Sequence, residues 1–499
     1  MRLGSRLFVA IALVCAAQAV AQQTHDHPAP EKLGQVSFPI SCKSAVQAEF
    51  NRAVALLHSF AYSAAREAFQ DVAHRDPQCA MAHWGIAMTY YHQLWEPAIP
   101  GDSVTKGQQE VEIAQKVGAA TDRERGFISA AGTVYQNANT VPYATRSLNY
   151  EHAMAELAAQ NKDVEVQVFY ALALLANAPP TDKEHVRQKK AAAILEPLYA
   201  ANPDHPGIPH YLIHAYDNAE LAQKGLPAAR VYAQIAPAAP HALHMPSHIF
   251  TRLGLWDDSI ASNLAASDAA RKAGDIGEQL HAMDYLVYAY LQSGRDADAA
   301  NVIEQLKTIP DLNVGTFKVG YAATAMPIRY IVERGQWAEA AQIKPPASAP
   351  PHVIAIAVWA RGLGMARSGH PDQANGAIQE LQGLQDKLRA SGNEYWATQV
   401  EIMRREVMAW TDQAQGKQQD AVALLREAAD EEDSIEKLPV TPGPIIPARE
   451  QLGDLLLEQG HLEQAAEEFQ TALASSPGRR GSLRGLSESE ERLRASKTN

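Results

Sequence analysis

The chain has 499 residues, of which 46% are hydrophobic and 20% charged, and its formal net charge is −13. This excess of acidic groups argues against nucleic acid or an anionic membrane surface as a partner, because both are polyanions. The length exceeds what one compact core usually organises. The chain is therefore either several domains or a repeat protein whose core grows by stacking.

The first 21 residues have the pattern of an export signal. Arg2 and Arg6 precede an apolar run from Leu7 to Val14, and Ala19-Val20-Ala21 offers a cleavage site between small residues. The sequence predicts a cleaved signal peptide over residues 1–21 and a periplasmic or secreted protein. Cleavage removes the two arginines and takes the net charge from −13 to −15. No run reaches the roughly 18 apolar residues of a spanning helix, so we expect no membrane span.

Two cysteines remain after cleavage, Cys42 and Cys79. In an oxidising compartment they can form a disulfide that ties the entry segment to the first helices. The alternative is two free buried thiols, because spacing alone does not establish that the residues are neighbours. Residues 22–40, which precede the first cysteine, are predicted to form an extended arm.

Internal repeats indicate the architecture, and the clearest unit lies near the C-terminus. Large apolar, small, aromatic and helix-ending residues recur there at fixed offsets, at Leu452, Gly453, Leu456, Gly460, Ala465, Phe469, Ala472 and Pro477. This pattern resembles the tetratricopeptide repeat (TPR) superfamily. The resemblance implies an all-α fold, a right-handed α-solenoid of TPR-like helix pairs. No stretch alternates apolar and polar residues long enough to indicate a sheet.

Further units extend the repeat over most of the chain. Glycines that we expect at helix-to-helix turns stand at Gly254, Gly294, Gly335, Gly369 and Gly416. Proline-rich segments separate the repeats into three groups. We predict N-terminal repeats over residues 41–180, central repeats over 181–345 and C-terminal repeats over 346–478. A polar tail over 479–499 follows.

Histidine is concentrated in the central repeats. Six of the 18 histidines fall between His205 and His248. His210 and His244 are 34 residues apart, as are His214 and His248, and this spacing is one ideal repeat. The resemblance implies that positions two, five and nine of each first helix line a concave groove. In that register the groove carries His210, His214, His241, His244, His248, His281 and Asp284.

This arrangement predicts a metal site. Histidines four residues apart share a helix face, and first helices of successive repeats run side by side, so the pairs should converge on one patch. Imidazoles, with a carboxylate at hand, suit divalent transition metals, of which we expect Zn²⁺ or Cu²⁺. Asp217 is a further candidate for a ligand or for orienting an imidazole. As groove residues, the histidines should be removable at little cost to stability.

Substrate-binding candidates surround the same patch. Arg252 could meet a carboxylate or phosphate of a substrate, and Tyr211 and Tyr288 supply phenols. A peptide, protein or small molecule would then occupy the groove. Three functions stay open: a metal-dependent enzyme, a non-enzymatic scaffold that grips a peptide or partner protein, and a metal storage or delivery protein.

Familiar catalytic motifs do not narrow this choice. The sequence has no Cys-x-x-Cys-His haem site, no His-Glu-x-x-His zinc-protease motif and no Gly-x-Ser-x-Gly elbow. The segments HYLIHAYD and HMPSHIFTRLGLW resemble those of a group of exported bacterial TPR proteins of unassigned activity. That resemblance implies a compartment and a fold but no reaction.

Overall fold

Helices make up the regular structure of residues 31–94 and 99–498, the part of the chain that the computed structural model describes. No strand occurs within these ranges, which confirms the predicted all-α fold. The predicted signal peptide and residues 22–30 of the predicted arm lie outside the described residues. Residues 32–499 form one compact unit.

The helices of the first half follow one another with short connections, after a 3₁₀ turn at Ser44–Val46. They are α1 (Gln47–His58), α2 (Tyr62–Arg75), α3 (Ala80–Met88), α4 (Gly101–Val117), α5 (Asp122–Tyr135), α6 (Tyr143–Gln160), α7 (Val164–Ala176), α8 (Val186–Ala201), α9 (Gly207–Tyr216), α10 (Ala222–Ile235), α11 (Pro240–His244) and α12 (Pro246–Arg252).

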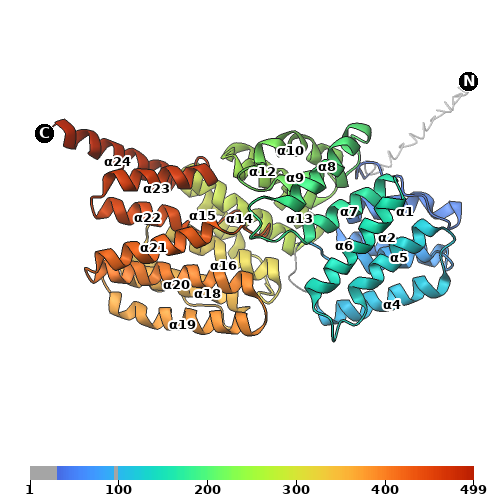
Figure 1. The fold of residues 1–499 in the computed structure, drawn as a ribbon, viewed down its shortest axis with the longest axis horizontal. Coiled ribbons are helices and arrows are strands. Elements are labelled where there is room, and N and C mark those ends of the chain that lie inside the picture. The colour runs from blue at the N-terminus through green and yellow to red at the C-terminus, as the bar shows by residue number, and fades with distance from the viewer. Residues whose placement is uncertain (1–30, 95–98, 499) are drawn as a thin grey trace, which may run out of the picture. The chain divides into compact units, whose positions relative to one another are not determined.

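The second half continues in the same way to the C-terminus (Figure 1). Its helices are α13 (Trp256–Ala273), α14 (Ile276–Gln292), α15 (Asp296–Lys307), α16 (Phe317–Val332), α17 (Trp337–Ala340), α18 (Pro351–Arg367), α19 (Pro371–Ala390), α20 (Glu394–Ala414), α21 (Gln418–Asp433), α22 (Ala448–Glu458), α23 (Leu462–Ser475) and α24 (Arg480–Thr498). The predicted boundaries near residues 180 and 345 fall between α7 and α8 and between α17 and α18.

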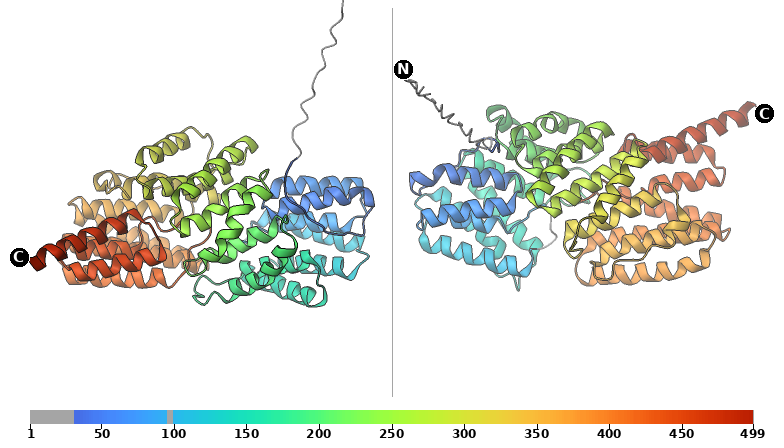
Figure 2. Two further views of the ribbon diagram at one scale, coloured as in Figure 1. Left: turned by 90° about the horizontal axis from the view of Figure 1, so that it is seen from above. Right: turned by 180° about the vertical axis from the view of Figure 1, so that it is seen from behind.

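Successive helices pack as pairs, as the tetratricopeptide pattern predicts. Each helix contacts the next, and first helices of neighbouring pairs also contact one another, in the series α14, α16, α18, α20 and α22 (Figure 2). The five predicted turn glycines all have positive φ, between 65° and 88°, a conformation that side chains disfavour. The chain is therefore an α-solenoid of TPR-like helix pairs.

The unit formed by α22 and α23 shows why the repeat needs its small residues. Gly453 faces the Phe469 ring so closely that an added Cβ would lie 2.8 Å from a ring carbon. Phe469 and Ala465 are fully buried. The glycine thus lets the two helices approach until the aromatic ring fills the space between them.

The N-terminal arm is held against the stack where it is described. Residues 32–40 form no helix or strand, and Phe38 is fully buried beside Phe50, Trp84 and Phe127. Cys42 and Cys79 are joined by a disulfide with their Cα atoms 5.0 Å apart. The bond links the end of the arm to the start of α3.

The polar tail is helical rather than irregular. Residues 480–498 form α24, which is preceded by the fully buried Arg479. Its guanidinium donates to Glu450 at 2.8 Å and to Glu333 at 2.9 Å, and these bonds fix the start of the helix. Among the described helices, none is long and apolar enough to cross a membrane.

Candidate metal centre

Four short stretches of helix carry the six candidate histidines. His210 and His214 lie one turn apart on α9, and His281 lies on α14. His241 and His244 belong to α11, and His248 belongs to α12. Pro246 separates α11 from α12, because proline at a first helical position supplies no N–H to the preceding turn.

The structure divides the six imidazoles into two groups of three, rather than joining His210, His214, His244 and His248 in one patch. His210, His214 and His241 form the first triad, and His244, His248 and His281 form the second triad. Within each triad, one ring nitrogen per residue lies within 4.8 Å of the others. The triads adjoin, with the His214 and His248 ring centres 5.9 Å apart.

Hydrogen bonds fix the tautomers in the first triad. The Nδ1–H of His210 donates to the backbone carbonyl of His58 at 2.6 Å, and the Nδ1–H of His241 donates to the Glu278 carboxylate at 3.0 Å. Each ring then presents an unprotonated Nε2, and these two atoms lie 3.2 Å apart. The Nε2 of His214 is buried without a hydrogen-bond partner among the described residues.

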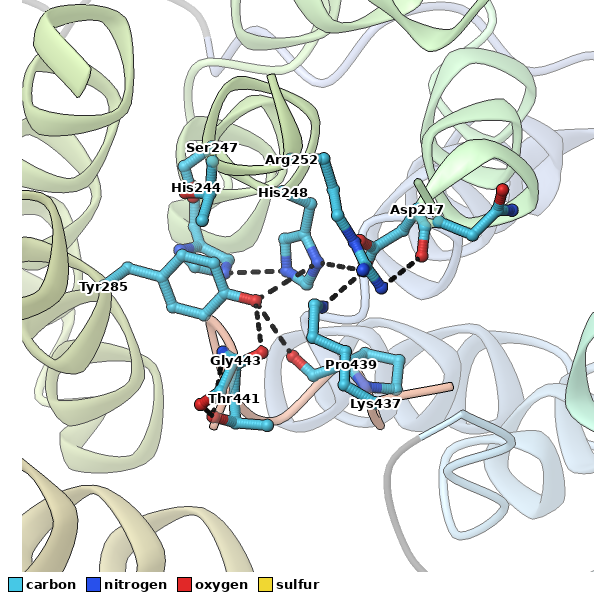
Figure 3. Close-up of polar contacts among 12 residues, drawn as sticks. Asp217, His244, Ser247, His248, Arg252, Tyr285, Lys437, Pro439, Thr441 and Gly443 are labelled. Atoms are coloured by element: carbon cyan, nitrogen blue, oxygen red, sulfur yellow. Dashed lines mark hydrogen bonds and ion pairs between the residues drawn. The ribbon is translucent and has the colours of Figure 1, made fainter. Parts of the chain in front are cut away.

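The second triad repeats this arrangement with different partners. The Nδ1–H of His244 donates to the side-chain oxygen of Asn263 at 2.6 Å. The Asn263 amide is oriented by its own donation to the Ser259 carbonyl at 2.8 Å. The Nδ1–H of His248 donates to Asp217 at 2.8 Å (Figure 3). The unprotonated Nε2 atoms of His244 and His248 face each other at 3.0 Å.

Facing lone pairs at these distances repel unless a cation lies between them. Two nitrogen ligands of one tetrahedral Zn²⁺, each about 2.0–2.1 Å from the metal, stand about 3.3 Å apart. A bridging proton would need a charged imidazolium in each triad. Such a charge is disfavoured on His210, His244 and His248, because burial lowers the pKa of each of these rings. Each triad could therefore hold a metal ion.

The pKa values support neutral imidazoles. Burial, followed by the neighbouring imidazoles, lowers the pKa of His210, His214, His244 and His281 well below its ordinary value. Burial also lowers the pKa of His248, to about 4, although its hydrogen bond to Asp217 acts in the opposite direction. Neutral rings are the form that binds metal.

Two buried carboxylates, those of Asp217 and Glu278, accept hydrogen bonds from triad histidines and are held in the ionised form by nearby charges. Burial opposes ionisation of Asp217, but Lys437 and Arg252 hold its pKa well below the usual range. Burial likewise opposes ionisation of Glu278, and Lys318 and His241 lower its pKa. Both carboxylates are thus ionised acceptors for an imidazole N–H, the arrangement that orients metal-bound histidines.

The centre is enclosed rather than exposed along an open groove. The six side chains are at most 9% exposed. On one side the Phe60 ring, set by a positive φ of 54°, lies over the first triad with its centre 4.5 Å from that of His210. On the other side a segment that we call the strap, residues 435–447 between α21 and α22, crosses the second triad.

The strap is fixed to helices of the central repeats by polar contacts. Tyr285 donates to the carbonyls of Thr441 at 3.1 Å and Pro439 at 3.3 Å, and the Lys437 ammonium binds Asp217 at 3.0 Å (Figure 3). Arg329 donates to the Pro444 carbonyl at 3.0 Å. The strap therefore lies against α14 and α16, beside the second triad.

The other predicted site residues lie outside the triads. Asp284 is fully buried on α14, with its carboxylate 3.6 Å from Arg329, and burial raises its pKa to about 6. Arg252 binds Asp217 at 2.9 Å, so its charge is engaged within the protein. Tyr288 lies against the guanidinium of Arg329. Tyr211 is in the interior, 2.9 Å from the Nδ1 of His58.

Sequence reasoning missed several residues that support the triads. Glu278 lies three residues before His281 on α14, and this spacing on one helix face could have indicated it. Asn263 on α13 and Lys437 in the strap had no such signal, because tertiary packing alone brings them to the site.

A third cluster of the same residue types is fully hydrogen-bonded. Glu165 accepts from His58 at 2.9 Å and from His205 at 3.0 Å. The Nδ1 of His205 accepts from the Gly207 N–H, and the Nδ1 of His58 accepts from Tyr211. Every ring nitrogen here has a partner, so the cluster offers no lone pair to a metal. It supports the first triad by holding His58, whose carbonyl orients His210.

Comparisons with known proteins give little further information. A profile described as a family of unknown function (DUF6197) matches residues 327–431, which lie outside both triads. No curated protein matches the sequence. A solved structure of an IFIT1 monomeric mutant with m7Gppp-AAAA is 11% identical with a TM-score of 0.38, covering 83% of this chain and 90% of that chain. The TPR domain of P58(IPK) is 11% identical with a TM-score of 0.22, covering 91% and 100%.

Proposed function

We propose that the protein is exported and holds two transition-metal ions, one in each histidine triad, at a centre enclosed by the helical stack. The observation that carries this proposal is the pair of facing Nε2 atoms in each triad, at 3.2 Å and 3.0 Å, with the Nδ1 protons bound elsewhere. Export is proposed from the N-terminal sequence pattern alone.

The ligand set favours Zn²⁺ or Cu²⁺. All six candidate ligands are imidazoles, which suit these ions, and the two mature cysteines are bonded to each other and offer no thiolate. Three protein ligands leave a coordination position open on each ion, which is typical of catalytic rather than structural sites. Adjacent ions with open positions can bind one small molecule between them.

This geometry favours a metal-dependent enzyme over the other two functions. A storage protein would need no open coordination position and no enclosed pair of sites. A peptide-binding scaffold would need the helices beside the second triad free to contact a peptide, and there the strap is already hydrogen-bonded to Tyr285. Binding of a peptide there would require the strap to leave.

Metal content of the purified mature protein tests the proposal. We expect two metal ions per chain, loss of both with a strong chelator, and a lower melting temperature after that loss. The double variant His244→Ala/His248→Ala should retain one ion. A matched variant of two exposed histidines, His74→Ala/His461→Ala, should retain both. Wild-type protein without metal, or a triad variant that still binds two ions, would contradict the proposal.

A further inference from the structure

A cavity lies beyond the strap, beside the C-terminal repeats. Its volume is about 160 Å³, and none of the six triad histidines lines it. The walls come from α14, α16, α18 and α20 and from the strap itself. Five aromatic side chains form much of the lining: Tyr288, Tyr321, Trp359, Tyr395 and Trp396. Concave, mostly apolar cavities with a few polar groups are the usual form of small-molecule sites.

The cations that line this cavity all form ion pairs with carboxylates of the protein. Lys183 binds Glu436, and Arg252 and Lys437 both bind Asp217. Arg449, the fourth lining cation, binds Asp433 and Asp430. Each lining cation is therefore ion-paired within the protein, and three of them, Lys183, Arg252 and Lys437, share the two carboxylates of Glu436 and Asp217.

Two lining carboxyl groups have no such partner. Glu406 on α20 and Glu432 at the end of α21 line the cavity and form no direct ion pair with any described residue, although the charges of Arg479 and Arg449 act on Glu432. Glu406 is 2% exposed and accepts from the Trp359 indole N–H at 2.5 Å. Glu432 accepts from the Ala448 backbone N–H at 2.8 Å. These neutral donors satisfy one oxygen each but supply no positive charge.

The two carboxyl groups affect one another. Burial, together with the neighbouring Glu432, raises the pKa of Glu406 well above its usual value. Burial raises the pKa of Glu432 to about 8, although the hydrogen bond from Ala448 acts against this. Arg479 and Arg449 oppose the rise at Glu432 only in part, and no cation among the described residues acts on Glu406, so a cation between the two groups would favour the ionised form of both.

A buried indole N–H without a hydrogen-bond partner is a second indication that this cavity binds a ligand. Trp396 is 4% exposed, and its Nε1–H is buried with no hydrogen-bond partner among the described residues. Trp396 lines the cavity together with the two carboxyl groups. A buried donor without an acceptor is uncommon in folded proteins, and a bound molecule would supply one.

We propose that this cavity binds a small organic cation, an amidinium, guanidinium or ammonium group carried on a flat apolar body. The positive group lies between Glu406 and Glu432, and the body packs on the aromatic walls, whose ring faces attract cations. The site is separate from the histidine triads and does not depend on the metal proposal.

Three probes of nearly equal shape test this assignment on the full mature chain by isothermal titration calorimetry. Benzamidine is a planar cation, benzamide is its neutral counterpart and benzoate its anionic one. At neutral pH benzamidine is present as the amidinium, which has no nitrogen lone pair to offer a metal ion, so its binding reports on this cavity. We expect benzamidine to bind at least tenfold more tightly than benzamide, and benzoate to bind most weakly, since hydrogen bonds to a charged group are the stronger ones.

Variants locate the binding. Glu406→Gln keeps the shape and should weaken benzamidine at least tenfold, whereas Glu427→Gln, an exposed residue on α21, should leave it unchanged. Melting temperatures show that both variants fold. The assignment is overturned if benzamidine does not bind, if benzamide binds as tightly, or if Glu406→Gln leaves the affinity unaltered. If Glu406→Gln fails to fold, the relative affinities of the three probes for the wild-type protein still test the preference for a cation.

Discussion

Replacing Asn263 by leucine should weaken the second metal site and leave the first intact. Leucine has nearly the same shape, but it removes the oxygen that accepts the His244 Nδ1–H at 2.6 Å. The imidazole then loses the bond that fixes its tautomer. Loss of such an orienting partner typically lowers metal affinity 10–100-fold, which corresponds to about 1.4–2.8 kcal/mol. The first triad keeps its own supports, the His58 carbonyl and Glu278.

A competition titration with a chromophoric chelator, which resolves the two binding steps, measures this effect. Asn375→Leu, at an exposed position on α19, is the matched control and should leave both steps unchanged. In the metal-free protein the unsatisfied Nδ1–H should also cost about 1–3 kcal/mol of unfolding free energy, measured with urea. Equal second-step affinity in Asn263→Leu and wild type, or equal weakening of both steps, would refute the reasoning.

Three further predictions concern acid, the disulfide and export. Histidine has a pKa of about 6.5 in the unfolded chain. Because burial lowers the pKa in the folded state, the unfolded chain takes up protons first, and stability falls as pH drops from about 6.5 towards the folded values. For His248, with a folded pKa of about 4, the loss at about pH 5 is about 2 kcal/mol. An unchanged urea midpoint of metal-free protein between about pH 7.5 and 5 would count against this. Cys42→Ala/Cys79→Ala removes a bond that closes 37 residues and should lower the unfolding free energy by about 4 kcal/mol in urea titrations. Two free thiols in denatured, unreduced wild-type protein would show that the bond does not form. N-terminal sequencing of exported protein should begin at Gln22, and retention of Met1 would disprove cleavage.

The helical stack could be predicted because its determinants are local in sequence. Gly453, Ala465 and Phe469 stand at fixed offsets, and each acts on the adjacent helix of the same pair. The turn glycines, such as Gly294 with φ of 75°, mark where one helix ends and the next begins. The 34-residue spacing of the histidines likewise placed them on neighbouring first helices.

The enclosure of the site could not be predicted, because it depends on residues distant in sequence. Lys437 binds Asp217 across 220 residues, and the contacts of Phe60 with the first triad depend on the end of α1. Repeat register placed the histidines along a groove but gave no indication that the strap covers it. The expectation that they could be removed at little cost therefore needs revision, since their rings are buried and hydrogen-bonded.

The roles of the carboxylates could also be predicted only in part from the sequence. Asp284 was expected near the metal because it occupies a groove position, yet Arg329 lies beside it and it joins neither triad. Asp217 and Glu278 orient imidazoles instead, through contacts made in the folded chain. The sequence shows which side chains can accept a hydrogen bond from an imidazole N–H, but tertiary packing determines which of them does so.

Anomalous X-ray diffraction at the absorption edge of the bound metal tests the central claim most directly. We predict two peaks per chain, one about 2.0–2.2 Å from a ring nitrogen of each of His210, His214 and His241, and one placed in the same way among His244, His248 and His281. Crystals of metal-loaded protein with no peak in either triad, or with a single peak bound by residues elsewhere, would contradict the account.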